Sequence, residues 1–336
     1  MRALTRKLLR DLWGMKGQVA AIAMVIAGGV ATFIMSAATL AALQLTQAAF
    51  YRDYRFAEVF ASLKRAPESL RAAIQDIPGV QYVETRVVAS ANLDLESYPD
   101  PATAQVVSIP DAGEGVLNRL HLRRGRTVDA SRENEIILSE SFADAHGFRP
   151  GDHLYATING RRKRLDIVGV ALSPEYIFQL PPGSVIPDFK SYGIFWMART
   201  PLGTAYDLDG AFNGVTLTLT AGTRPEEVIA RLDPLLARYG GQGAYGRKDQ
   251  LSHRYLYEEF RGLRLMATMF PVIFLSVAAF LLNVSVTRLI ATQREQVAIL
   301  KAFGYSNLAV VWHYIQFVLV IVLLGVAAGV AAGAWL

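Results

Sequence analysis

The sequence predicts a membrane α-helical protein with three transmembrane helices and one large α+β domain outside the bilayer. Of the 336 residues, 52% are hydrophobic and 19% are charged, which is too apolar for an ordinary soluble domain of this length. Asp, Glu, Lys and Arg are absent from residues 17–51, 265–287 and 302–336, and each stretch can cross a bilayer as a helix. Between the first two stretches, strand and helix patterns alternate.

The distribution of charge predicts how the chain is oriented in the membrane. Residues 1–16 carry five basic side chains and one acidic side chain, and residues 288–301 carry three basic side chains and one acidic side chain. Residues 52–264 have a net charge of −1. Because basic flanks remain in the cytoplasm, we expect the N-terminus and 288–301 to be cytoplasmic and 52–264 to be periplasmic or extracellular. The chain is then a multi-pass protein of the cell inner (plasma) membrane. The formal net charge of +5 gives no reason to expect nucleic acid as a partner, since its excess lies beside the membrane.

The predicted segments follow in order along the chain. They are a cytoplasmic basic helix at 1–18, transmembrane helices at 19–45, 265–287 and 307–336, an extracytoplasmic domain at 46–264, and a cytoplasmic loop at 288–306. We expect the first span to be a retained anchor rather than a cleaved signal peptide, because the apolar core of a signal peptide has only about 7–15 residues.

Two βαβ-like units are predicted at the two edges of the outer domain, at 58–95 and 214–248. In the first unit, a β-prone stretch precedes a helix that starts at Pro67, and Pro78 with the following glycine stops this helix before a strand at 80–95. The second unit repeats the strand and helix patterns. Two such units in one domain predict a split, ferredoxin-like α+β core.

A β-rich insertion is predicted between the two units, at 100–210. Within it, 153–170 has the pattern of a β-hairpin around Asn159-Gly160, a strong turn sequence. Residues 173–195 contain four prolines, which predicts irregular structure. After the second βαβ unit, 250–264 is charged and helical in pattern, and we expect it to form a stalk that continues into the second span.

No pattern for a catalytic, cofactor or metal site emerges from the sequence. The chain contains no cysteine and no G-x-x-x-x-G-K-[ST] loop, and its five histidines do not fall at metal-ligand spacings. Residues 241–246 match G-x-G-x-x-G, but a dinucleotide site needs this motif between a strand and a helix. Here the motif follows a predicted helix, so we interpret it as a loop.

The transmembrane segments contain packing signals and no charged side chains. Ion-coupled carriers usually keep ionisable residues in their spans, so their absence argues against that class of transporter. Gly325, Gly329 and Gly333 form a doubled G-x-x-x-G motif, which indicates close approach of another helix. The motif leaves open whether that helix lies in this chain, in a missing continuation or in a second copy. Gly28 and Gly29 in the first span permit a similar approach.

The cytoplasmic loop contains the candidate partner-binding site. Residues 293–303 predict a short amphipathic helix, with Gly304 suited to its C-terminal cap and Ser306 to the N-cap of the next helix. The loop is either a docking helix for a cytoplasmic partner or a connector at the membrane interface. The predicted docking residues comprise an apolar stripe with its neighbouring charges and cap: Arg294, Glu295, Val297, Ile299, Leu300, Lys301, Phe303 and Gly304.

This loop is also where the sequence resembles a known family. Residues 294–305, REQVAILKAFGY, resemble the R-E-x-(I/V)-A-(I/L)-L-(K/R)-A-x-G signature that follows the second span of FtsX-like and MacB-type ABC transporter permeases. The outer domain resembles the MacB-like periplasmic core domain at 122–126 (LRRGR), 135–139 (EIILS) and 150–152 (PGD). The resemblance implies a non-catalytic permease subunit whose partner, a separate cytoplasmic ABC ATPase, hydrolyses ATP to drive movement of the outer domain.

The resemblance also implies further segments and partners. Permeases of this family normally have a fourth span and often a duplicated second half, so we expect the chain, which ends at Leu336, to be truncated after the third span. A second permease copy or the missing half, membrane lipid and a periplasmic adaptor are the other expected partners. The alternative function is a membrane-anchored extracytoplasmic ligand sensor or adaptor, and a membrane enzyme ranks third because no catalytic cluster is present.

Overall fold

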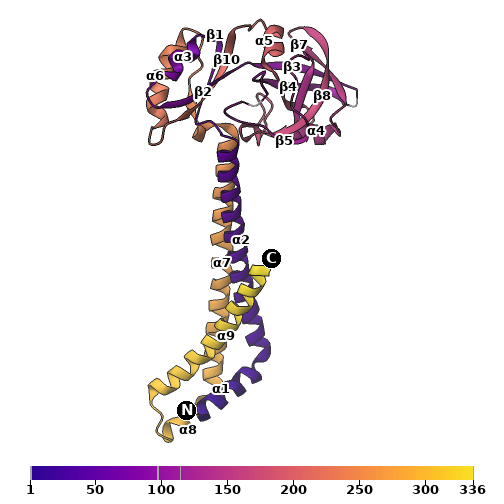
Figure 1. Ribbon diagram of the computed structural model, residues 1–336. Coiled ribbons are helices and arrows are strands. Elements are labelled where there is room, and N and C mark those ends of the chain that lie inside the picture. The colour runs from indigo at the N-terminus through magenta and orange to yellow at the C-terminus, as the bar shows by residue number, and fades with distance from the viewer. Residues whose placement is uncertain (1, 97, 114, 336) are drawn as a thin grey trace. The chain divides into compact units, whose positions relative to one another are not determined.

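The computed structural model describes residues 2–96, 98–113 and 115–335 of the chain (Figure 1). Two compact units make it up. Residues Met1–Thr46 and Glu258–Leu336 form one unit, and residues Gln47–Tyr257 form the other. We call them the membrane unit and the periplasmic unit, after the locations that the sequence predicts for them. Two long helices contribute residues to both units.

Among the described residues, three helices are long and apolar enough to cross a membrane: α2 (Lys16–Asp53), α7 (Leu251–Thr292) and α9 (Asn307–Trp335). A short helix, α1 (Arg2–Gly14), precedes α2, and α8 (Arg294–Ala302) lies between α7 and α9. The predicted stalk and second span form one unbroken helix, as expected. The core of the membrane unit consists of buried apolar side chains from α1, α2, α7 and α9, among them Leu8, Ile26, Leu289 and Phe317, and α8 contributes the partly buried Val297.

The glycine motif of the third span packs against the first span of the same chain. A β-carbon added to Gly325 would lie 2.7 Å from Cβ of Ile26, and one added to Gly329 would lie 2.8 Å from the carbonyl oxygen of Ala27. Both distances are shorter than side chains tolerate, so the absence of a side chain is what allows α9 to reach α2. Gly29 has the equivalent role against α7, because its β-carbon would lie 2.9 Å from Cβ of Phe274. These contacts identify the intramolecular alternative as the one present for the glycine motif.

One part of the periplasmic unit is a four-stranded antiparallel sheet. Its strands are β1 (Val59–Pro67), β2 (Val80–Arg86), β10 (Ala211–Leu219) and β11 (Tyr245–Gly246), in the order β11-β1-β10-β2. The helices α3 (Leu70–Gln75) and α6 (Pro225–Ala237) pack together on one face of this sheet (Figure 1). Ile74 of α3 and Leu232 of α6 are fully buried in this core, so the apolar faces of both helices are covered by the sheet.

The structure corrects two details of the first βαβ unit. Pro67 does not start a helix, because it is the last residue of β1 and α3 begins at Leu70. The stretch 80–95 is not one strand, because it divides at Val87 into β2 and a second strand that joins another sheet. Main-chain and side-chain hydrogen bonds between Val87 and Ser108 mark the change of partner. Alternating sequence patterns do not reveal such a change, since both strands retain the same period of two.

The other part of the periplasmic unit is a small β-barrel. Its strands are β3 (Val88–Leu95), β4 (Tyr98–Ile109), β5 (His121–Gly125), β6 (Glu135–Ser139), β7 (His153–Ile158), β8 (Arg161–Leu172) and β9 (Tyr192–Ala198). They follow the order β5-β8-β6-β9-β4-β3-β7, and a further pairing between β7 and β8 closes the barrel. The described elements next to it are α4 (Glu140–His146), α5 (Arg199–Ala205), and two 3₁₀ turns, η1 (Pro174–Tyr176) before β9 and η2 (Arg247–Asp249) before α7.

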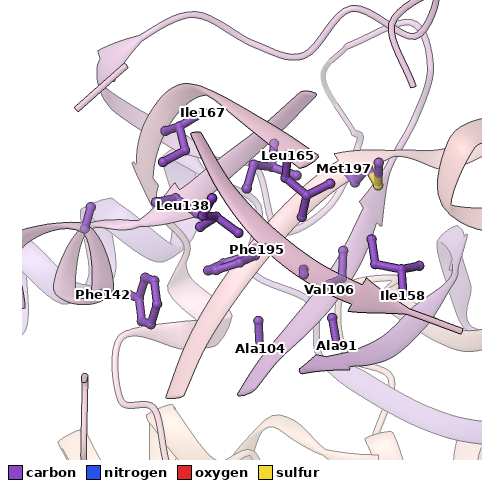
Figure 2. Packing of buried hydrophobic residues seen from close by; sticks show 14 of the residues in the cluster. Ala91, Ala104, Val106, Leu138, Phe142, Ile158, Leu165, Ile167, Phe195 and Met197 are labelled. Atoms are coloured by element: carbon purple, nitrogen blue, oxygen red, sulfur yellow. The ribbon is translucent and has the colours of Figure 1, made fainter. Parts of the chain in front are cut away.

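The barrel interior is filled by apolar side chains from several strands. Leu138, Leu165 and Phe195 are fully buried and point into the same space, as Figure 2 shows. The barrel therefore begins at Val88, earlier than the predicted insertion at 100–210. Residues 192–195 also differ from the prediction of irregular structure, because they begin β9, which is buried along its whole length.

Two turn predictions are confirmed. Asn159 and Gly160 have positive φ angles of 45° and 77° and connect β7 to β8, as expected for a tight hairpin turn. The G-x-G-x-x-G sequence at 241–246 follows helix α6 and contributes only the two-residue strand β11. It does not open a helix, so it lacks the geometry of a dinucleotide site.

Candidate functional site

Helix α8 is bounded by defined caps at both of its ends. At its start, the chain leaves α7 at Gln293, whose φ and ψ of −105° and 20° break the helix. At its end, Gly304 has a φ of +87°, and the amides of Gly304 and Tyr305 donate to the carbonyls of Lys301 and Leu300. This is a Schellman cap, which a glycine in the left-handed conformation favours. The connection to α9 therefore has a fixed geometry.

The start of α9 is capped as the sequence predicts. The hydroxyl oxygen of Ser306 accepts a hydrogen bond of 3.2 Å from the amide of Ala309, which satisfies one of the free amide groups at the N-terminus of a helix. The two caps together hold α8 and α9 in a short helix-turn-helix connection.

The structure divides the predicted apolar stripe of α8 into two faces. Val297 packs against the core of the membrane unit, and Leu300 is half-buried. Ile299 and Phe303, in contrast, are 56% and 80% exposed. A single continuous stripe of four side chains is therefore the wrong description, because α8 uses one side to attach to its own unit and presents the other to the surroundings.

The charged residues predicted beside the stripe are exposed. Arg294 and Glu295 lie in the first turn of α8, and Lys301 lies in the last. None of these three side chains forms an ion pair within the described part of the chain. The exposed face of α8 thus combines two large apolar side chains with charges of both signs.

A buried polar cluster lies where α8 begins. The amide of Gln293 donates to Oδ1 of Asp11 at 3.0 Å, and its oxygen accepts from Nζ of Lys7 at 2.5 Å. Lys7 also donates to Oδ2 of Asp11 at 2.6 Å, and the side chains of this ion pair are only 10% and 7% exposed. Buried polar groups of this kind keep their positions because breaking one contact leaves another unpaired. The α7–α8 junction is thereby attached to α1.

Two residues of α9 complete this cluster. Nε2 of His313 lies 3.4 Å from Oδ2 of Asp11, and the hydroxyl of Tyr314 donates to the oxygen of Gln293 at 3.4 Å. The cluster formed by Lys7, Asp11, Gln293, His313 and Tyr314, called the Asp11 cluster below, therefore connects α1 and α9 to the junction. Sequence reasoning missed it, because the histidines were considered only for metal-ligand spacing. The available signals were Asp11, an acid in a basic segment, and a histidine inside an apolar span.

No group of three or more potential metal ligands occurs among the residues that the structure describes. The geometry is that of a helical membrane unit with a capped, exposed helix on one connection. The FtsX-like permease C-terminal family matches residues 268–336, and the MacB-like periplasmic core domain family matches residues 17–235, more than half of the chain. The chain belongs to the FtsX-like permeases with a MacB-like periplasmic core domain.

This permease also resembles solved periplasmic and extracellular domains. The extracellular domain of the noncanonic ABC-type transporter YknZ from Gram-positive bacteria is 13% identical, with a TM-score of 0.37, and the match covers 56% of this chain and 98% of that one. The periplasmic region of MacB from Actinobacillus actinomycetemcomitans is 11% identical, with a TM-score of 0.37 over 63% of this chain and 95% of that one. A domain of a putative permease from Porphyromonas gingivalis is 17% identical, with a TM-score of 0.33, and the match covers 57% of this chain and 90% of that one.

No curated protein matches the sequence. Family membership establishes that the chain is a membrane protein with a periplasmic domain and is the non-catalytic transmembrane subunit of an ABC transporter. It also confirms the resemblance that the cytoplasmic loop and the outer domain carried in the sequence. Permeases of the FtsX family pair with ABC ATPases, which directs attention to the exposed face of α8.

Proposed function

We propose that this permease transmits the ATP-driven motion of a separate cytoplasmic ATPase to its periplasmic domain, with α8 as the helix that binds the ATPase. The observation that carries the proposal is the exposed apolar pair Ile299 and Phe303 on a short, capped helix. An amphipathic helix that places such side chains in a partner's groove is a common mode of recognition. The charges of Arg294, Glu295 and Lys301 would then lie at the rim and fix orientation.

The apolar core of each span lacks charged residues, which supports a permease that transmits movement rather than one that couples transport to ions. The hydropathy of the three candidate spans ranges from 2.2 to 2.6, and residues 17–51, 265–287 and 302–336 contain no Asp, Glu, Lys or Arg. A carrier that couples transport to ions needs ionisable groups within the bilayer. We therefore propose that the periplasmic domain acts on the substrate, at or beyond the outer leaflet.

The proposal requires that α8 face the cytoplasm, and the basic flanks support this orientation. A cysteine-free chain makes the orientation simple to test, because introduced cysteines are the only thiols. Cysteines at Arg161 and Gln296, both exposed, should react with a membrane-impermeant reagent from opposite sides. Labelling of both from the same side would refute the orientation and, with it, the docking role of α8.

We also propose that the four-stranded part of the periplasmic unit is a split, ferredoxin-like fold. Its two βαβ units, β1-α3-β2 and β10-α6-β11, supply strands that alternate in the sheet as β11-β1-β10-β2. The barrel is inserted between the two units. Under this proposal, the barrel moves as a separate body attached to the ferredoxin-like part.

The docking role of α8 is tested by placing a charge in its exposed face. Phe303→Asp in the complete permease should reduce co-purification with the ATPase at least about tenfold, because loss of an aromatic anchor costs about 2 kcal/mol or more and about 1.4 kcal/mol corresponds to a factor of ten. ATP turnover stimulated by the permease should fall in parallel. Phe303 is 80% exposed, so the substitution leaves the packing of the permease itself unchanged.

Val185→Asp is the matched control, because Val185 is an apolar side chain of the periplasmic unit that is 87% exposed. It places the same charge on an equally exposed position away from α8. If the Phe303 and Val185 variants both co-purified with the ATPase as well as the wild-type permease does, α8 would be only a connector.

A further inference from the structure

A buried ion pair joins the two parts of the periplasmic unit. Arg86 ends strand β2 of the four-stranded sheet, and Glu175 lies in the 3₁₀ turn η1 that follows the last strand residues of β8. The guanidinium donates to both carboxylate oxygens of Glu175 at 2.5 Å, and the two side chains are 13% and 6% exposed. Such a bidentate pair fixes both distance and orientation. Asn118 donates a further hydrogen bond of 3.0 Å to the same carboxylate.

The first turn of α7 holds the same glutamate through its main chain. The side-chain amide of Gln250, directly before α7, donates to the carbonyl oxygen of Glu175 at 2.7 Å, and the hydroxyl of Ser252 donates to that oxygen at 2.8 Å. Ser252 is fully buried and also accepts from the amide of Phe178 at 3.1 Å. Tyr255, one turn later, stacks on the ring of Phe178 with centroids 3.7 Å apart. Any displacement of this turn of α7 therefore displaces η1.

Two cavities border the ion pair. A cavity of about 110 Å³ is lined by Arg86, Glu175 and Asn118 together with residues of the barrel. A second cavity, of about 270 Å³, contacts the same Arg86 and Glu175 together with Tyr176 and Tyr245. Close-packed interiors resist displacement, whereas a joint that borders two cavities has room for its parts to tilt.

Other contacts between the sheet and the barrel are weaker candidates for this role. Arg199 of α5 pairs with Glu68 at 2.6 Å, and these side chains are 24% and 38% exposed. Arg199 also donates to the main-chain carbonyls of Thr85 and Ala211, but none of these partners belongs to α7. Asn213 exchanges two hydrogen bonds with the main chain of Val88, and these bonds do not include α7. Glu175 is the residue that meets the sheet, the barrel and the start of α7.

From this geometry we infer that Glu175 is the positioning residue through which movement of α7 changes the angle between the four-stranded sheet and the barrel. The inference rests on the proposed function, since it assigns a route to the motion that the ATPase would supply. A pull on the first turn of α7 moves the main chain of Glu175, and the rigid ion pair passes this movement to Arg86 and strand β2. The two cavities change volume as the parts tilt.

The test measures the distance between the two parts in the complete permease assembled with its ATPase in proteoliposomes of phosphatidylethanolamine and phosphatidylglycerol. Nitroxide labels on cysteines at Arg231, in α6, and at Arg161, in β8, report the distance by pulsed electron paramagnetic resonance. Both positions are exposed and the chain has no other cysteine. We expect the distance distribution to differ between the nucleotide-free and the ATP–vanadate states in wild type, and this difference to vanish in Glu175→Gln.

A double variant separates positioning from simple stability. Arg86→Met combined with Glu175→Gln removes the unpaired buried charge that the single variant leaves, so the thermal unfolding temperature should recover. The nucleotide-dependent change in distance should not recover, because the rigid connection is still missing. Glu227→Gln, which breaks an exposed carboxylate–arginine pair in α6, is the matched control and should retain the wild-type change.

Two results would overturn the inference: a wild-type complex whose distance does not respond to nucleotide, or a double variant whose distance responds as wild type does. Either result leaves the docking role of α8 intact if the ATPase still co-purifies and Phe303→Asp still abolishes binding. Failure of the ATPase to bind wild type would instead refute the proposed function itself, and the inference with it.

Discussion

Two buried carboxylates, Asp11 in the membrane unit and Glu175 in the periplasmic unit, each hold several elements together, but they do so in different ways. Asp11 contacts Lys7, Gln293 and His313 through side chains alone. Glu175 contacts Arg86 through its side chain and the first turn of α7 through its main-chain carbonyl. Only Glu175 therefore transmits a movement of one element directly through the backbone to an ion pair on another.

The surroundings of the two carboxylates differ as well. Apolar side chains such as Leu8, Leu289 and Phe317 are buried in the core that Tyr314 of the Asp11 cluster shares. Glu175, in contrast, lines two cavities. Close packing fixes geometry, so the difference indicates that the Asp11 cluster holds the start of α8 still while the Arg86–Glu175 pair works as a joint. Burial of a charged side chain alone therefore does not show whether the contact is rigid or allows movement.

The largest expected effect is the loss of the Glu175 carboxylate. Glu175→Ala leaves the guanidinium of Arg86 buried without its partner, which should lower the free energy of unfolding of the periplasmic unit by about 3–5 kcal/mol. Chemical unfolding of the complete chain in detergent, followed by tryptophan fluorescence, measures this change, since Trp196 borders the cavity beside the pair. A change below about 1 kcal/mol would mean that the pair is solvated and the joint is not rigid.

A smaller effect is expected at the Asp11 cluster. Asp11→Ala also removes a buried partner, but the long, flexible side chain of Lys7 can extend toward solvent. We expect a loss of about 1–3 kcal/mol, the cost of an unsatisfied buried group, in the unfolding of the membrane unit. Permease-stimulated ATP turnover should fall more than the abundance of the protein does, because α8 loses its attachment to α1. Turnover that falls only in proportion to abundance would limit the cluster to a structural role.

Gly329→Leu tests whether α9 needs a small residue to pack against α2. The added side chain would meet Val30 and the carbonyl of Ala27, so α9 must move away from α2, at a cost of about 1–3 kcal/mol. Crosslinking between cysteines at Ala27 and Ala328 should decrease relative to a control that carries Ala331→Leu on an exposed position. Unchanged crosslinking in the Gly329 variant would show that the glycine face does not need close contact.

A pH-dependent effect is expected at Glu135, a third buried carboxylate that belongs to neither group. Hydrogen bonds from Arg126 lower the pKa of Glu135 despite the opposing effect of burial. Because its pKa in the folded state lies below the unfolded value of about 4.3, its contribution to stability is complete above that pH and is lost as the pH falls through the folded pKa. Glu135→Gln should therefore unfold with less dependence on pH below about 4.3 than wild type. Equal slopes would place the acid sensitivity of the fold at groups other than Glu135.

The smallest effect is expected where an ion pair is exposed. Arg162 and Asp94 are bonded at 2.6 Å, yet their side chains are 62% and 56% exposed. Arg162→Ala should change the free energy of unfolding by at most about 1 kcal/mol, because water and salt screen such pairs. A larger change would show that short distances, rather than burial, set the strength of ion pairs in this chain, and would weaken the contrast with Glu175.

The sequence by itself determined the features that depend on local pattern. Apolar stretches predicted the three long helices, the glycine spacing predicted a close helix contact, and Asn159-Gly160 predicted the hairpin turn. The caps at Gly304 and Ser306 also follow from single residues, because the conformations they favour are local. The signature at 294–305 pointed to the permease family for the same reason, since it lies within one short segment.

Only the tertiary structure decided which distant residues meet. Nothing in the alternation of 80–95 shows that the chain changes sheets at Val87, because strands in either sheet have the same period. Likewise, helical spacing does not show which side of α8 turns toward its own unit, so Val297 and Ile299 could not be separated before the packing was known. The joint at Glu175 depends on residues as far apart in the sequence as Arg86 and Ser252. Their contact arises from the pairing of strands and the start of α7, and no short stretch of sequence contains that information.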